Sequence, residues 1–140
     1  MKVRDIMTTD VEVARPDETI QSVAERMSSG DFGFMPVCDG RKLQGAVTDR
    51  DLAVRALAKG LPPQTPVAEV MTRDIEWRTA DDDARDLLDV MGSQAIRRLP
   101  IVDDERNLVG VVSIGDLSKK VKERFAGEAL EDISRQPATN

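Results

Sequence analysis

The stretch LQGAVTDRDL at residues 43–52 returns as LVGVVSIGDL at residues 108–117. In both copies a short apolar run ends in a hydroxyl residue, and an Asp-Leu pair follows three residues later. An apolar run of this length is consistent with a buried strand, and a hydroxyl residue at its end is typical of a helix N-cap. The two stretches therefore predict the same strand-to-helix junction twice in one chain.

The repetition extends over most of the sequence. VRDIMT at residues 3–8 returns as VAEVMT at 67–72, and MPVCD at 35–39 returns as LPIVD at 99–103. A single register held over about 50 residues indicates a duplication. We expect one copy at 1–62, a Pro-rich linker at 63–66, a second copy at 67–126 and a polar tail at 127–140.

Each copy is predicted to follow the order β-α-β-β-α. Apolar spacing and turn residues place extended pieces at 11–13 and 75–77, hairpin strands at 34–38 with 43–47 and 99–102 with 108–112, and second helices at 49–59 and 114–125. Asp17 or Thr19 is expected to cap the first helix, Asp81 its counterpart, and Gly30 and Gly92 lie near the expected helix ends.

A unit of about 60 residues has a marginal core by itself. Two such units bury their exposed faces if they pack together. We therefore expect an α/β fold of the α+β kind, in which the two copies pack sheet to sheet with pseudo-twofold symmetry and leave two related clefts between them.

Composition excludes several classes of function. The chain has no His and one Cys, Cys38, so it lacks the residues for a Ser-His-Asp or Cys-His nucleophile, a His-ligated zinc site or an internal disulfide. The net charge of −6 gives no chain-wide attraction for nucleic acid, and neither a signal peptide nor a transmembrane run is evident. These features predict a cytoplasmic protein that is not an enzyme, with no metal, nucleic-acid or membrane partner.

The two junctions are the candidate functional sites. Thr48 with Asp51, and Ser113 with Asp116, place a hydroxyl and a carboxylate around a helix N-terminus. The carboxylate can accept hydrogen bonds from the hydroxyls of a ribose, and the hydroxyl and free amides can receive a phosphate. The same spacing resembles a capping box, in which both side chains serve only to start the helix. The sequence alone does not distinguish a ligand site from a helix cap at either junction.

In combination, the repeated pieces resemble a tandem pair of cystathionine-β-synthase (CBS) motifs, the Bateman module. The resemblance covers Val3 to about Phe125. It implies a regulatory ligand that contains adenosine (AMP, ADP, ATP, NAD or S-adenosylmethionine) in the clefts between the motifs, and no catalytic cofactor. It also implies that Asp51 and Asp116 hold ribose hydroxyls, with Thr48 and Ser113 beside the ribose or phosphate.

The resemblance assigns further residues at the start of the second strand of each copy. It implies that this segment borders the base and the phosphates; the base-pocket candidates are Phe34, Met35, Pro36, Leu99 and Pro100. Arg97 and Arg98, with Arg50, are the phosphate candidates, because a guanidinium offers fixed charge and several donors. We expect the site lined by Arg97 and Arg98 to prefer the more phosphorylated ligand. The alternative for these arginines is a solvated surface position.

The family resemblance finally implies a homodimer and a separate effector protein that reads the ligand state. The sequence thus favours a regulatory adenosine-nucleotide sensor. The alternative is a protein-interaction scaffold that binds no ligand and uses the two junctions only as helix caps.

Overall fold

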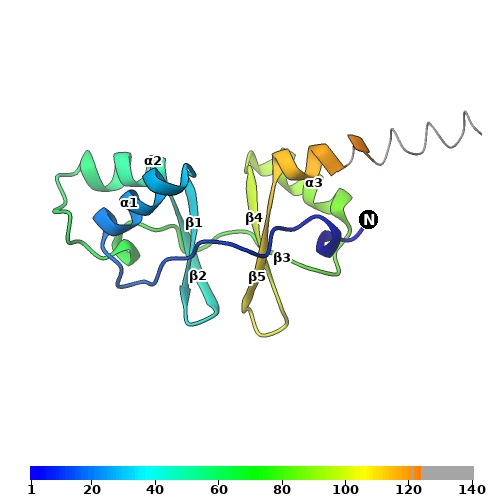
Figure 1. Cartoon of the computed structure of the whole chain (residues 1–140), viewed down its shortest axis with the longest axis horizontal. Coiled ribbons are helices and arrows are strands. Elements are labelled where there is room, and N and C mark those ends of the chain that lie inside the picture. The colour runs from blue at the N-terminus through cyan, green and yellow to red at the C-terminus, as the bar shows by residue number, and fades with distance from the viewer. Residues whose placement is uncertain (121, 124–140) are drawn as a thin grey trace, which may run out of the picture.

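The computed structural model describes residues 1–120 and 122–123, which form two similar lobes side by side (Figure 1). The first lobe contains α1 (Ile20–Gly30), β1 (Phe34–Asp39), β2 (Lys42–Thr48), α2 (Asp49–Asp51) and the π-helical turns η2 (Leu52–Leu57). The second contains β3 (Arg78–Thr79), α3 (Ala84–Gln94), β4 (Arg98–Val102), β5 (Leu108–Ser113) and helical residues 114–120. Two short 3₁₀ helices, η1 (Val3–Asp5) and η3 (Val67–Glu69), complete the described elements.

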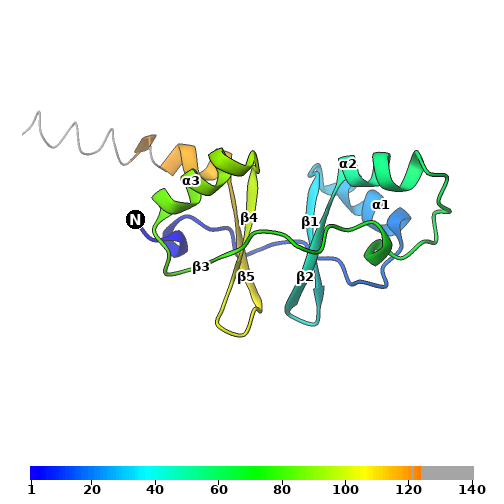
Figure 2. The same cartoon turned by 180° about the vertical axis from the view of Figure 1, so that it is seen from behind.

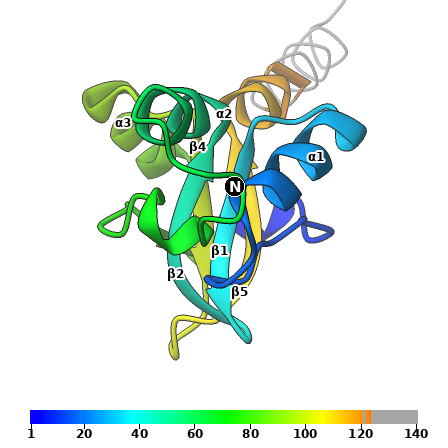
Figure 3. The same ribbon diagram turned by 90° about the vertical axis from the view of Figure 1, so that its left-hand side faces the viewer.

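The predicted α+β fold with sheet-to-sheet packing is confirmed. The two hairpins face each other at the centre, and the helices cover their outer sides (Figure 1). A half-turn about the vertical axis gives nearly the same outline with the lobes exchanged, as a pseudo-twofold axis requires (Figure 2). In the end view, the helices lie around the upper part of the hairpins and the hairpin turns extend below them (Figure 3).

Both predicted hairpins are present. Strand β1 pairs antiparallel with β2, and β4 pairs antiparallel with β5. The third strand differs from the prediction: β3 lies at 78–79, just after the expected 75–77, and pairs parallel with β4. In the first lobe a single bridge from Ala14 to Val37 takes its place, just beyond the expected 11–13.

The helix ends correct several details of the prediction. Thr19 caps α1, since its Oγ1 accepts a hydrogen bond from the Ser22 amide at 3.1 Å. Asp83 caps α3 instead of Asp81, because a turn between Thr79 and Asp82 delays the start of the helix. Asp81 instead forms salt bridges with the side chains of Lys2 and Arg4.

The left-handed residues at the helix ends are Asp31 and Ala95, both with φ of 55°. Gly30 closes α1 as its last helical residue, and Gly92 lies inside α3, so neither takes the expected left-handed role. Of the predicted helix at 114–125, residues 114–120 and 122–123 are helical. Its end and the predicted tail at 127–140 lie outside the described residues.

The first segment of each sequence copy packs on the lobe formed by the other copy. Val3 and Ile6 belong to the hydrophobic core of the second lobe, whereas Val67, Val70 and Met71 belong to that of the first. In Figure 1 the N-terminus accordingly lies on the lobe that holds α3. The two sequence copies are therefore interlocked, although they follow one another along the chain.

We call residues 3–8 and 67–72 the exchanged segments. Backbone hydrogen bonds hold each of them against a strand of the other copy. Thr8 and Val111 exchange two bonds, both of 2.9 Å, and Ala46 and Thr72 exchange two of 3.0 and 2.9 Å. A Cβ atom added at Gly110 would lie 2.9 Å from the Thr8 carbonyl oxygen. The glycine repeated in both junction stretches is therefore needed where the exchanged segment crosses the strand.

Candidate functional site

The first junction forms a complete capping box. Thr48 Oγ1 accepts a hydrogen bond from the Asp51 amide at 3.1 Å, and Asp51 Oδ2 accepts one from the Thr48 amide at 2.9 Å. The Asp51 carboxylate, only 18% exposed, also lies 3.8 Å from Arg55 Nε. Both side chains that were expected to hold a ligand are therefore engaged in contacts within the lobe.

Arg55 extends this network to the exchanged segment. Its Nη1 atom donates to Thr72 Oγ1 at 3.2 Å and to the Val70 carbonyl oxygen at 3.4 Å. The guanidinium thus links the helical turns after Asp51 to the segment that crosses from the other copy.

The second junction is only half formed. Ser113 Oγ accepts a hydrogen bond from the Asp116 amide at 3.0 Å, as in a simple cap. Within residues 1–120 and 122–123, no partner binds the carboxylate of Asp116, which belongs to an exposed residue. Arg98 pairs directly with Ser113 across β4 and β5. The two junctions therefore differ in their hydrogen bonds, although their sequences are duplicated.

A cavity of about 290 Å³ opens at the second junction. Its walls come from three parts of the chain: the second lobe, the first lobe and the N-terminal segment. The lining residues are Thr8, Asp10, Val11, Glu12, Phe32, Phe34, Arg98, Val111, Ser113 and Asp116. Two phenyl rings, a guanidinium, two hydroxyls and three carboxylates thus share one small cleft between the lobes.

Of the sequence-predicted site residues, the cavity brings together Ser113, Asp116, Arg98 and Phe34. Arg97 and Arg50 are exposed and do not line it. The Arg97 carbonyl oxygen accepts a bond from the Ile114 amide, and the Arg50 amide donates to Asp49 Oδ1 at 2.9 Å.

The remaining base-pocket candidates lie in the interior of the strands. Met35 and Leu99 are fully buried in the cores of the two lobes. Pro36 and Pro100 are buried in β1 and β4, and none of the four lines this cavity. Their assignment to a base pocket stays a prediction from the resemblance.

The sequence interpretation missed Asp10, Glu12 and Phe32. Asp10 repeats as Asp74 in the second copy, which is a signal that could have drawn attention to it. Glu12 is positioned by Arg26 of α1, whose Nη2 lies 2.5 Å from Glu12 Oε2 and whose Nη1 lies 2.7 Å from Glu18 Oε1. The hydrogen bond to Glu12 raises the pKa of the Arg26 guanidinium, and this partly exposed ion pair stands at the wall of the cavity.

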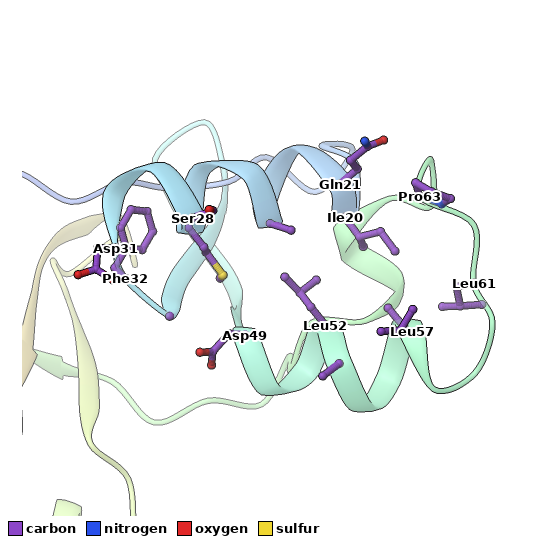
Figure 4. Close-up of a pocket in the computed structure, with 15 residues that line it drawn as sticks. Ile20, Gln21, Ser28, Asp31, Phe32, Asp49, Leu52, Leu57, Leu61 and Pro63 are labelled. Carbon is purple, nitrogen blue, oxygen red and sulfur yellow. The ribbon is translucent and has the colours of Figure 1, made fainter.

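A larger cavity of about 840 Å³ lies on the outer side of the first lobe. Figure 4 shows Ile20 from α1 and Leu52 and Leu57 from η2 pointing into the space between these helices. Leu57 is 78% exposed and Val54 of the same turns is 50% exposed. This groove is apolar and suits a second apolar surface better than a charged ligand.

Three further observations concern nucleophilic chemistry, metal binding and membrane insertion. Burial raises the pKa of the Cys38 thiol to about 11, so the thiol is neutral at pH 7 and a poor nucleophile. In the part of the chain that the structure describes, no three His, Cys, Asp or Glu side chains are arranged to hold a metal ion. The same part contains no helix that is long and apolar enough to span a membrane.

These features define a duplicated α+β module whose lobes exchange their first segments and enclose a polar cleft. Residues 3–57 and 67–123 each match the family model of the CBS domain. The chain belongs to the CBS domain family and carries a pair of CBS motifs.

Comparison with individual proteins agrees with this assignment. The chain is 42% identical over 135 residues to the CBS domain-containing protein YhcV of Bacillus subtilis, and the match covers 96% of each chain. The crystal structure of Hypoxic Response Protein I with two coordinated zinc ions is 33% identical, with a TM-score of 0.78 over 86% of this chain and 98% of that one. The CBS domain pair of protein MJ0100, in complex with 5′-methylthioadenosine and S-adenosyl-L-methionine, is 27% identical, with a TM-score of 0.78 over 89% and 98%.

Proposed function

We propose that this chain is a regulatory sensor module that binds an adenosine-containing ligand between its CBS motifs and signals to a separate effector protein. The observation that carries the proposal is the cavity that joins Ser113 and Asp116 to Arg98 and Phe34. The adenosine-type ligands bound by the CBS domain pair of MJ0100 support it. The role is regulation in the cytoplasm, without catalysis and without a nucleic-acid or membrane partner.

Each part of an adenosine ligand has a suitable partner in the cleft. The Asp116 carboxylate can accept from both ribose hydroxyls, because an ionised carboxylate offers two acceptor oxygens. Phe32 and Phe34 offer aromatic faces to the base. Arg98 can bind one phosphate with several donors. A volume of about 290 Å³ is close to the lower end of small-molecule pockets, about 300 Å³.

The charge of the cleft favours a ligand with few phosphates. Asp10, Glu12 and Asp116 line the cavity with one guanidinium, that of Arg98; Arg26 pairs with Glu12 from outside the lining, and Arg97 does not line the cavity. Like charges close together repel strongly where water is partly excluded. The expectation that this site prefers the more phosphorylated ligand is therefore not supported by its lining, and we propose the reverse order.

A mechanism for signalling the bound state follows from the three parts of the chain that form the cavity walls. The cavity touches both lobes and the exchanged N-terminal segment, so a ligand bound there would contact all three parts of the chain. Such a ligand shifts an equilibrium only if its affinity differs between the two arrangements. The effector would recognise the arrangement that the ligand favours.

The outer groove supports a homodimer as part of the proposal. Leu57 and Val54 are exposed on the helical face of the first lobe, beside the apolar groove. Large exposed apolar patches mark interaction sites. We expect a second copy to cover this face. Sedimentation velocity should show a dimer for the wild type and a monomer for Leu57→Glu, while Gln44→Glu, at an exposed position that does not line the groove, changes the net charge by the same one unit and serves as the control.

One observation favours the alternative function, a scaffold that binds no ligand. The complete capping box of Thr48 and Asp51 shows that the repeated spacing serves helix initiation in at least one copy. If the second junction has the same role, no adenosine compound binds.

A thermal-shift panel separates the two functions. The full chain is melted with AMP, ADP, ATP, NAD, S-adenosylmethionine and 5′-methylthioadenosine at millimolar concentration, beside the Asp116→Ala variant. A ligand at 100 times its Kd stabilises the folded state by about 2.7 kcal/mol, which raises Tm by several degrees. We expect this rise in the wild type and not in Asp116→Ala. Unchanged melting with all six compounds would favour the scaffold.

A further inference from the structure

The two junctions can be compared position by position, because the repeat aligns them at an offset of 65. Thr48 corresponds to Ser113 and Asp51 to Asp116, so both have the residues of a ligand site. Arg55 corresponds to Lys120, and this pair behaves differently in the two lobes.

In the first lobe, contacts within the chain occupy the groups a ligand would use. The Thr48 amide donates to the Asp51 carboxylate, and Arg55 lies beside the other oxygen of that carboxylate. Arg55 also donates to the hydroxyl of Thr72. A ribose that bound Asp51 would have to break the capping bond and compete with a guanidinium, both of which lower its affinity.

In the second lobe, Lys120 contacts a residue of its own helix, and the Asp116 carboxylate has no contact among the described residues. Lys120 Nζ lies 3.7 Å from Glu123 Oε2, on the next turn of its own helix. Thr8, the counterpart of Thr72, lines the cavity together with Asp116. Among the described residues, nothing binds the Asp116 carboxylate, so a ribose there displaces no protein contact.

The aromatic lining differs as well. Phe32 and Phe34 both line the cavity at the second junction. The positions that correspond to them by the offset of 64 are Ile96 and Arg98, so the first junction lacks the matching pair of phenyl rings. Phe34 lies opposite Thr48 across β1 and β2, so the first junction has one neighbouring phenyl ring where the cavity at the second junction has two.

We propose that the duplicated junctions have divided roles. The Ser113–Asp116 junction is the single adenosine site of the chain. The Thr48–Asp51 junction has a structural role: it caps its helix, and Arg55 beside it holds the exchanged segment at 67–72 against the first lobe. This inference rests on the proposed function and adds to it the stoichiometry, one ligand for each chain, and the location.

Isothermal titration of the full chain with 5′-methylthioadenosine and with AMP tests the division. We compare the wild type with Asp116→Asn and Asp51→Asn, a matched pair that removes the same charge from the two junctions. We expect one ligand for each chain in the wild type. Affinity should fall at least tenfold in Asp116→Asn and change less than threefold in Asp51→Asn, which instead should melt at a lower temperature.

Arg55→Met provides a second variant of the first junction, because it keeps both capping residues, Thr48 and Asp51, and removes only the guanidinium beside them. It should bind one ligand with the affinity of the wild type. Two ligands for each wild-type chain, or a tenfold loss in Asp51→Asn or Arg55→Met, would overturn the division of roles while leaving the proposed function standing. A wild type that binds neither compound would overturn both.

Discussion

Replacing Gly45 by Ala tests whether the exchanged segment at 67–72 lies against β2. An added Cβ would overlap the carbonyl oxygen of Thr72 and would also lie 3.2 Å from its carbonyl carbon and 3.3 Å from Met71 Sδ. Since the nearest atom belongs to the backbone, a side-chain rotation cannot relieve the overlap. The segment must move away from the strand.

The contacts that this shift disturbs give an estimate of the loss of stability. The shift lengthens two backbone hydrogen bonds between Ala46 and Thr72, now 3.0 and 2.9 Å, each worth about 1 kcal/mol. It also loosens Met71, which is only 6% exposed, for roughly 1 kcal/mol more. Lower entropy of the unfolded alanine chain offsets about 0.4–1 kcal/mol. We expect Gly45→Ala to lower the free energy of unfolding by about 2–3 kcal/mol.

Urea denaturation followed by circular dichroism measures this change. Gly92→Ala is the matched control, because Gly92 lies inside α3 and an added Cβ meets no atom within 4 Å. Alanine is the better helix former, so the control should gain about 0.5–1 kcal/mol. If Gly45→Ala unfolds at the same urea concentration as the wild type or at a higher one, the exchanged segment does not pack as described.

Three further predictions concern single side chains. Thr48→Ala should lose about 1 kcal/mol of stability in urea, since it removes one half of a capping box, and it should keep its affinity for an adenosine ligand; a tenfold loss of affinity would place a ligand at the first junction. Arg26→Met should lose roughly 1–2 kcal/mol in the same assay and weaken ligand binding, because Arg26 holds Glu12 at the cavity wall; unchanged binding would mean that Glu12 needs no such support. The neutral Cys38 thiol, with its pKa raised to about 11 by burial, contributes stability that is fully present below the ordinary thiol pKa of 9.0 and is lost as the pH rises toward 11. Urea titrations from pH 8 to 11 should show a loss of roughly 2–3 kcal/mol that is absent in Cys38→Ala, and identical pH profiles would contradict a buried thiol.

The repeat predicted the hairpins, the first helix of each lobe and the sheet-to-sheet arrangement because these depend on local patterns. Apolar runs flanking a polar turn specify β1 with β2 and β4 with β5, and helical spacing places Val23 and Met27 in the core. The exchange of the first segments was not predictable in this way. Val3 belongs to the same hydrophobic core as Leu87 of the other copy, and periodicity within a sequence cannot predict such a tertiary arrangement.

The chemistry of the candidate site was predicted, and so was a difference between the two sites, but that difference was expected from Arg97 and Arg98 and not from the contacts at the junctions. Ser113 and Asp116 follow from the duplicated junction, and Arg98 and Phe34 from the resemblance. The repeated Thr/Ser-x-x-Asp spacing by itself predicts two equal junctions. The contact of Arg55 with Thr72, which helps to distinguish the first junction from the second, could not be predicted because it joins residues 17 positions apart.

A crystal structure of the full chain grown with saturating 5′-methylthioadenosine would locate the adenosine site. We expect one ligand for each chain, with both ribose hydroxyls within about 3 Å of the Asp116 carboxylate and the base beside Phe32 and Phe34. A ligand at Thr48 and Asp51, a ligand in the groove between α1 and η2, or an empty cleft at saturating concentration would contradict this expectation.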